Sequence, residues 1–394
     1  MRPSGIGVVS SGRGRLVALL LASPTVLLVR TNFKRSRSPD RRTGHIPDPV
    51  APLDPPTTFE AAKAVAAAEQ AVRELNAAGS ITGLEAIGAL LLRSEAIASS
   101  RIEGYELSQR NLARALIDPR AARGTASTVA ANVIAMEQAI ALGEVDRPLT
   151  VDDIRAVHRT LMAGDPARVT PGEFRREQNW IGGRLDSPID ARFIPPPEDH
   201  VEGLMTDLVA FINRDDLPGV AQAAIAHAQF ETIHPFVDGN GRVGRCLIRA
   251  ALRRRGIAPS FVPPVSVVLA ARANAYVAGL VGYREGRISE WCASFAGACE
   301  RAASLSTELA DVIAKLEADW FERAGRPRRD SAVAKVIAAL PAQPKTSAAT
   351  IRAAIGASHQ RALDGLKALA DTGVVRQIME GGYDRQYAAD ELSG

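Results

Sequence analysis

The stretch that decides the fold is His234-Pro235-Phe236-Val237-Asp238-Gly239-Asn240-Gly241-Arg242-Val243-Gly244-Arg245. Residues 220–233, just before it, are rich in alanine and place apolar residues at helical spacing, which predicts a helix that ends near His234. Gly239-Asn240-Gly241 is a strong turn signal because glycine and asparagine tolerate positive φ angles. Residues 243–254 resume a helical pattern, so the sequence predicts a helix, a glycine turn and a second helix.

The polar side chains of this stretch suit a nucleotide polyphosphate. Backbone N–H groups in a turn at a helix N-terminus form a nest for anions, and the guanidinium groups of Arg242 and Arg245 match phosphate oxygens. Asp238 can hold a hard cation such as Mg²⁺ beside phosphates, and His234 is a candidate general base. The alternative is a capped helix–turn–helix joint with two solvated arginines.

The stretch matches the motif H-P-F-x-D-G-N-G-R-x-x-R of the Fic family at every specified position, and the chain resembles that family over roughly residues 57–301. Residues 171–175, 178–183 and 191–197 are similar to further family segments. Fic proteins are mostly AMP-transferases. The resemblance therefore implies transfer of AMP from ATP to a Ser, Thr or Tyr hydroxyl of a target protein, with release of pyrophosphate, and it implies ATP and Mg²⁺ as substrate and cofactor.

The resemblance also implies roles for single residues. His234 would take the proton from the target hydroxyl, and Asp238 would bind the metal. The residues implied to bind the nucleotide are Gly239, Asn240, Gly241, Arg242, Gly244, Arg245 and Tyr276. Val277 follows Tyr276 where many relatives have a second tyrosine, so Tyr276 either stacks on the adenine or packs as a core tyrosine.

A short β-hairpin is predicted between Gly182-Gly183 and residues 191–197. In the family this hairpin is a flap that docks the target segment by strand addition, because main-chain hydrogen bonds align an extended peptide with little demand on its sequence. Phe193 and Ile194 are the flap residues that the resemblance assigns to target docking.

A second motif concerns inhibition. Ser99-Ser100-Arg101-Ile102-Glu103-Gly104 is similar to the family's inhibitory pattern, Ser/Thr-x-x-x-Glu-Gly/Asn. The resemblance implies that Ser99 and Glu103 are inhibitory, and that the Glu103 carboxylate pairs with Arg245 and keeps the γ-phosphate from binding productively. The alternative is a helix-end glutamate on a solvated face.

Charge is distributed unevenly along the 394 residues, whose formal net charge is +4. Residues 1–45 hold nine Lys or Arg and one Asp, a net charge of +8, so the remaining residues carry −4. The basic balance of the whole chain is therefore no indication of nucleic-acid binding. We interpret residues 1–45 as a basic, disordered extension. Residues 16–29 are apolar but shorter than a span of about 20 residues, so we expect no membrane partner, with a signal peptide as the alternative.

The rest of the chain is predicted to be mostly α. Residues 46–145 form an N-terminal helical region with the inhibitory motif, residues 146–305 the Fic catalytic core, and residues 306–329 a linker helix. Residues 330–394 resemble a winged helix, whose third helix begins His359-Gln360-Arg361 and could contact DNA. The alternative is a wing for protein interaction or dimerisation. Three cysteines without metal spacing predict reduced core thiols and a cytoplasmic protein.

Two other functions stay open at this point. The first is removal of AMP from a modified protein, with Glu103 orienting the water. The second is a non-enzymatic, ATP-sensing winged-helix regulator of transcription. The sequence names neither the target protein nor the oligomeric state, and it leaves auto-modification and a homodimer as open alternatives.

Overall fold

The computed structural model describes residues 31–32, 44–77, 81–163, 169–183, 188–379 and 385–392. Most of the predicted extension, residues 1–45, therefore lies outside the described residues. The chain divides into two compact units. The larger unit comprises Pro24–Ala77 and Leu92–Ser304, and the smaller comprises Met1–Ser23, Ala78–Leu91 and Leu305–Gly394.

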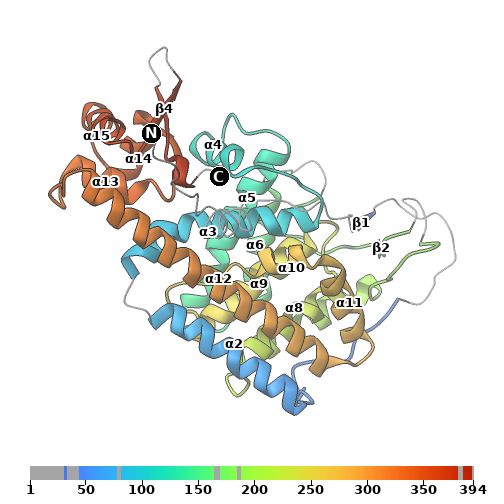
Figure 1. The fold of residues 1–394 in the computed structure, drawn as a ribbon. Helices are drawn as coiled ribbons and strands as arrows, with labels where there is room; N and C mark the ends of the chain where they lie inside the picture. Colours follow the sequence, from blue (N-terminus) through green and yellow to red (C-terminus); the bar gives the residue numbers. More distant parts are fainter. Residues whose placement is uncertain are drawn as a thin grey trace, which may run out of the picture. The chain divides into compact units, whose positions relative to one another are not determined.

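The larger unit is built almost entirely of helices, which confirms the predicted mostly α class (Figure 1). Two helices cross the unit boundary, α3 (Ile81–Ile102) and α12 (Ile288–Arg323). The helices that lie wholly in the unit are α2 (Phe59–Ala77), α4 (Gln109–Ile117), α5 (Thr125–Glu144), α6 (Val151–Met162), α7 (Val201–Ile212), α8 (Gly219–Ile233), α9 (Asn240–Arg254), α10 (Val265–Ala271) and α11 (Ala273–Arg284). A 3₁₀ turn, η1 (Glu198–His200), precedes α7.

Helices α8 and α9 form the centre of this unit. Helix α9 packs against α5, α6 and α8, whereas α8 also contacts α2, α7 and α11. Nearly every residue of α8 and the first thirteen residues of α9 are buried, including Arg242 and Arg245. A helix covered on all sides needs small residues where another helix crosses closely, and the alanine-rich sequence of α8 supplies them.

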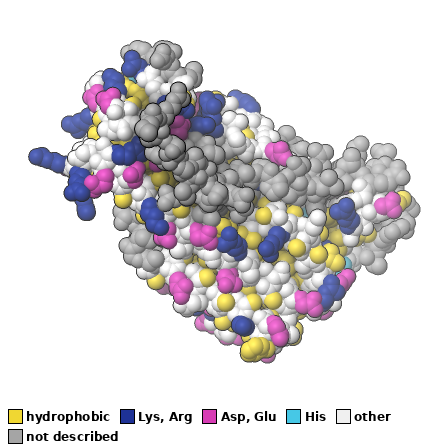
Figure 2. All heavy atoms as spheres, viewed as in Figure 1, with side chains coloured by type: hydrophobic (Ala, Val, Ile, Leu, Met, Phe, Trp, Pro, Cys, Tyr) yellow, Lys and Arg dark blue, Asp and Glu magenta, His cyan; other side chains and the backbone are white. Residues whose placement is uncertain are grey.

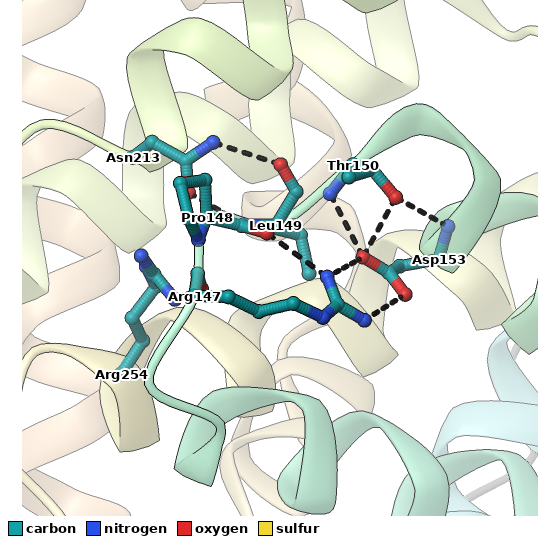
Figure 3. Close-up of polar contacts among 7 residues, drawn as sticks. All are labelled: Arg147, Pro148, Leu149, Thr150, Asp153, Asn213 and Arg254. Carbon is teal, nitrogen blue, oxygen red and sulfur yellow. Dashed lines mark hydrogen bonds and ion pairs between the residues drawn. The ribbon is translucent and has the colours of Figure 1, made fainter.

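Helix α6 is held in place by polar contacts at its N-terminus (Figure 3). Thr150 is its N-cap and forms a capping box with Asp153. Arg147 donates two 2.7 Å hydrogen bonds to the Asp153 carboxylate, and this contact lowers the pKa of Asp153 to about 2. Asn213 at the end of α7 exchanges hydrogen bonds of 2.8 and 2.9 Å with the backbone of Leu149. These contacts fix the helix that carries His158 towards the motif.

The smaller unit contains three short helices and a small antiparallel sheet. The helices are α13 (Ala332–Ala339), α14 (Ala348–Ile355) and α15 (His359–Asp371), and the strands are β3 (Lys345–Ser347), β4 (Arg376–Met379) and β5 (Gln386–Ala388), followed by η2 (Asp390–Leu392). The sheet has the order β3-β5-β4, and Thr346 pairs with Tyr387. Strand β3 was not predicted from the sequence, because three residues next to a helix cap give no alternating pattern. The winged-helix assignment and its DNA contact stay predictions.

Other described features bear on the class of protein. Both signs of charge are interspersed on the face drawn in Figure 2. Cys246, Cys292 and Cys299 are free and buried. Among the described residues no single helix has the length and apolar composition of a membrane span, and only the bent pair α10–α11 meets those criteria jointly.

Gly244→Ala tests the α8–α9 contact. A Cβ atom at residue 244 would lie 2.6 Å from Oε1 of Glu231 and 3.0 Å from Nδ1 of His227, so these buried α8 side chains or the two helices would have to shift. We expect a loss of about 1–3 kcal/mol in the free energy of unfolding, measured by urea denaturation. Gly203→Ala in α7 is the matched control, because nothing lies within 4 Å of that position. Equal stability of both variants would contradict the close approach.

Candidate active site

His234 lies where α8 ends. It is the C-cap residue, with φ 50° and ψ 59°, and its N–H donates to the carbonyl of Phe230 at 2.9 Å. A left-handed conformation is uncommon for a residue with a side chain, and here it turns the chain out of the helix while the imidazole stays 4% exposed. The predicted helix end near His234 is confirmed.

Arg175 holds the backbone around His234. Its Nε donates to the carbonyl of His234 at 3.0 Å, and its Nη2 donates to the carbonyl of Ile233 at 3.4 Å. Its own N–H donates to Pro235 O at 2.9 Å, and Nη2 also reaches the carbonyl of Pro196 next to the flap. The last carbonyls of a helix have no partner within it, so this arginine satisfies them and ties the flap base to His234.

The turn between His234 and α9 is fixed from two sides. The ring of His158 stacks on Phe236 at 3.7 Å, its Nδ1 accepts the N–H of Gly172 at 2.8 Å, and its Nε2 therefore donates to the carbonyl of Asp238 at 3.1 Å. Asn240 exchanges two 2.8 Å hydrogen bonds with the backbone of Phe236. Burial lowers the pKa of His158 to about 4, so this ring acts as a neutral support.

The His234 imidazole is available to accept a proton. Among the described residues neither ring nitrogen has a hydrogen-bond partner. Burial, followed by the nearby charges of Arg175 and Arg284, lowers the pKa of His234 to about 3, so the ring is neutral at physiological pH. A neutral imidazole with a free nitrogen in a buried site has the form that a general base requires.

The N-terminus of α9 presents groups that suit an anion. Gly239 is the N-cap with φ 82°, and its N–H donates to Oδ1 of Asp238 at 2.6 Å. The guanidinium of Arg242 is 1% exposed and lies 3.8 Å from the Asp238 carboxylate. Its Nε and Nη1 are buried and have no acceptor among the described residues. Buried donors without acceptors are costly, which is the signature of a site that awaits a ligand with oxygen atoms.

Arg245 lies one turn further along α9 and is paired. Its Nε donates to Oγ of Ser99 and its Nη2 to the carbonyl of Ser99, both at 2.8 Å. Its Nη2 also donates to Oε1 of Glu103 at 2.7 Å. Burial alone would lower the pKa of Arg245, but the charge and hydrogen bond of Glu103, together with Tyr276 and Glu231, outweigh it and raise the pKa on balance. The ion pair predicted between Glu103 and Arg245 is present.

The Glu103 carboxylate also lies at the predicted anion-binding turn, Gly239–Gly241. A Cβ atom on Gly241 would meet Oε1 of Glu103 at 1.9 Å, so the carboxylate lies directly against the first turn of α9. Gly104, with φ 85°, ends α3 in a Schellman turn, in which Tyr105 N–H donates to Ser100 O and Gly104 N–H donates to Arg101 O. This turn explains why the motif needs glycine after the glutamate.

Three residues assigned to nucleotide binding also make structural contacts, and their nucleotide-binding roles stay predictions. The Asn240 side chain exchanges two hydrogen bonds with the backbone of Phe236. Gly244 lies at the α8–α9 contact. Tyr276 is 6% exposed, and its hydroxyl lies 2.8 Å from Nε2 of His227. Tyr276 is thus buried, and it also hydrogen-bonds to Arg245, so both alternatives given for it stay predictions.

The flap is a minimal hairpin. Strand β2 (Trp180–Ile181) pairs with Phe193 through an antiparallel bridge, and on its other side with β1 (Thr31–Asn32). The N–H of His45 donates to the carbonyl of Ile194 at 2.9 Å. The guanidinium of Arg284 lies 3.8 Å above the Phe193 ring. Both predicted flap residues thus contact the rest of the larger unit.

Glu231 and Arg284 were not singled out from the sequence. Glu231 precedes His234 by one helical turn; burial raises the pKa of its carboxyl to about 7, and its Oε1 has no hydrogen-bond partner among the described residues. Burial likewise lowers the pKa of Arg284 to about 10. The spacing of Glu231 from His234 was the available signal, because residues three apart share a helix face.

The donor set fits a magnesium ion that a nucleotide would bring. Asp238 offers one carboxylate, 23% exposed, at the edge of the nest. The described residues contain no cluster of three or more metal-ligating side chains. Mg²⁺ is commonly held by one or two carboxylates together with substrate phosphates and water, rather than by a cage of protein ligands. Asp238 is therefore the residue that would hold it.

Comparison with known proteins agrees with this geometry. Protein adenylyltransferase Fic of Drosophila erecta is 36% identical over 118 residues, which are 29% of this chain and 22% of that protein. The Drosophila melanogaster protein of the same name has the same identity and coverage. The matching region thus spans about a fifth of the length of these curated relatives.

Solved structures extend the similarity in fold. A Fic family protein from Desulfovibrio desulfuricans G20 matches with a TM-score of 0.54 and 22% identity, covering 86% of this chain and 98% of that one. Residues 134–508 of Fic-1 from C. elegans match with a TM-score of 0.50 and 23% identity, covering 64% of this chain and 73% of that one. The Fic/DOC family model matches residues 148–252, which include His234, Asp238 and both arginines. Residues 148–252 of this chain thus match the Fic domain of the Fic/DOC family.

Proposed function

We propose that this protein transfers AMP from ATP to a hydroxyl side chain of a target protein and releases pyrophosphate. The observation that carries the proposal is the meeting of four groups around one turn: a neutral, unpartnered His234, the Asp238 carboxylate, and the buried guanidinium groups of Arg242 and Arg245. The curated relatives that match this region are named protein adenylyltransferases, which supports the same reaction.

The phosphates would bind at the N-terminus of α9. The N–H groups of the Gly239–Gly241 turn and the helix dipole favour negative charge there. Arg242 has two buried donors that lack acceptors, and Arg245 would bind the γ-phosphate after Glu103 leaves it. Two arginines at fixed spacing on one helix would orient the chain of phosphates, so that the α-phosphorus faces His234 for in-line attack.

His234 would then remove the proton of the attacking hydroxyl. A bond forms between the target oxygen and the α-phosphorus, the bond to the pyrophosphate oxygen breaks, and the proton passes to the imidazole. Mg²⁺, held by Asp238, would offset the charge that develops on pyrophosphate. Arg175 keeps the imidazole in place through the backbone of residues 233–235.

Glu103 would inhibit this reaction. Its carboxylate pairs with Arg245 at 2.7 Å and lies against Gly241 in the nest. It therefore uses the guanidinium that the γ-phosphate requires and repels that phosphate as well. Binding of ATP in a productive position requires that this carboxylate move away.

Radiolabel from α-labelled ATP tests the proposed reaction, and the test uses the Glu103→Gly chain because the carboxylate is proposed to inhibit transfer. We expect covalent label on protein in a cell lysate mixed with this purified variant, and no label from γ-labelled ATP at the same position. His234→Ala should lower the rate by roughly 10²–10⁴-fold, while ATP affinity measured by calorimetry stays within about twofold. Near-normal transfer by this variant would remove His234 from the mechanism.

The pH dependence of His234 follows from its burial. Because its pKa is lowered to about 3, the imidazole accepts no proton between pH 8 and pH 5 in the nucleotide-free protein. We expect the Cε1 signal of ¹³C-labelled His234, assigned with His234→Gln, to stay constant over that range. The acid limb of kcat/KM should accordingly lie below pH 5. A titration midpoint near 6.5 would show that the ring is solvated.

Glu103→Gly should raise labelling rather than lower it. Removing the carboxylate frees Arg245 for the γ-phosphate, and a charge-assisted hydrogen bond of roughly 1.5–3 kcal/mol corresponds to about one to two powers of ten in the competent fraction. Arg245→Ala should cancel the gain, because both changes act on one contact. Lower labelling by a folded Glu103→Gly variant would mean that Glu103 is itself required for the chemistry.

A further inference from the structure

The turn at the end of α3 places one side chain against Arg242 and another against Arg245 of α9. Glu103, the last residue before the turn, contacts Arg245 at 2.7 Å. Tyr105, two residues later, has its ring 5.1 Å from Cζ of Arg242. The left-handed Gly104 between them reverses the chain direction, so both side chains reach the same helix.

The environment of Arg242 makes the aromatic contact important. Its guanidinium is 1% exposed, and the Asp238 carboxylate lies 3.8 Å away, beyond hydrogen-bond distance. Nε and Nη1 have no acceptor among the described residues. Within about 6 Å an aromatic face attracts a guanidinium, and the attraction is stronger when the pair is shielded from water.

The geometry of such a stack leaves the arginine free to bind. A guanidinium is planar, and its N–H bonds point outwards within that plane. The Tyr105 ring, 5.1 Å from Cζ, therefore restricts movement of the group, while Nε and Nη1 keep no acceptor among the described residues. By contrast, the Glu103 carboxylate uses donors of Arg245 directly. The two contacts made by this turn have opposite consequences for an incoming phosphate.

We infer that Tyr105 is a positioning residue for the nucleotide: its ring holds the guanidinium plane of Arg242 so that the free donors face the phosphates. This role rests on the proposed function, because it requires phosphates at the N-terminus of α9. The Glu103–Tyr105 turn thus carries an inhibitory carboxylate and a supporting ring. Substitutions at these two positions change phosphate binding in opposite directions.

The test measures nucleotide affinity in the full chain, without any transfer step. We expect Tyr105→Leu to weaken binding of ATP and ADP by about tenfold, while adenosine, which has no phosphate, binds with unchanged affinity in calorimetry. Tyr105→Phe and Tyr105→Trp keep the aromatic face and should bind ATP within about twofold of the unsubstituted chain. The same pattern should recur in the Glu103→Gly background, where Arg245 is free.

Each other outcome overturns the inference. ATP binding by Tyr105→Leu that equals or exceeds normal would mean that the ring blocks the site. Loss in Tyr105→Phe equal to that in Tyr105→Leu would assign the effect to the hydroxyl. Equal weakening for ATP and adenosine would indicate a structural role. If circular dichroism shows that Tyr105→Leu is unfolded, Tyr105→Trp is the folded variant in which binding is measured. Because transfer is not measured, this pattern can hold even if α-labelled ATP yields no labelled protein.

Discussion

The buried positive charge of Arg245 is the constraint on which this site depends. Its guanidinium is 1% exposed on a helix that is covered on all sides. A charge in such a place requires a partner, since leaving one member of a buried pair alone costs about 3–5 kcal/mol. Ser99 and Glu103 supply the partner here. The Arg245 guanidinium therefore requires an anionic partner. That partner is either Glu103 at the end of α3 or, in the proposed function, a phosphate.

The turn between α8 and α9 is likewise held by distant parts of the chain. The turn leaves α8 in a left-handed conformation at His234 and enters α9 through another at Gly239. Contacts within the turn alone do not account for either left-handed conformation. Arg175 satisfies the carbonyls at the end of α8, and His158 stacks on Phe236 and donates to Asp238. The position of the base is thus set by side chains that the motif does not contain.

Sequence alone was sufficient for the helix–turn–helix around the motif, because it follows from a short pattern with strong local preferences. The Glu103–Arg245 pair joins residues 142 positions apart and was predicted only from the resemblance to the Fic family. Sequence alone could not reveal Arg175 or His158, whose partners lie 59 and 80 residues away along the chain. Gly244 and Asn240 also make structural contacts that the motif did not reveal. A glycine in a motif can allow close approach of a phosphate or of a neighbouring helix, and an asparagine can bind a ligand or the nearby backbone. The same sequence motif is compatible with either role.

Glu231 completes the charge balance of the site. Its carboxyl is buried near Arg245 and Arg284, and after burial itself the Glu103 charge is among the causes that raise its pKa to about 7. When Glu103 leaves Arg245, that repulsion weakens, so the pKa of Glu231 falls and the carboxyl ionises more fully at neutral pH. The ionisation of Glu231 therefore depends on which anion accompanies Arg245, so the carboxyls of Glu103 and Glu231 and the guanidinium of Arg245 form one coupled set of charges.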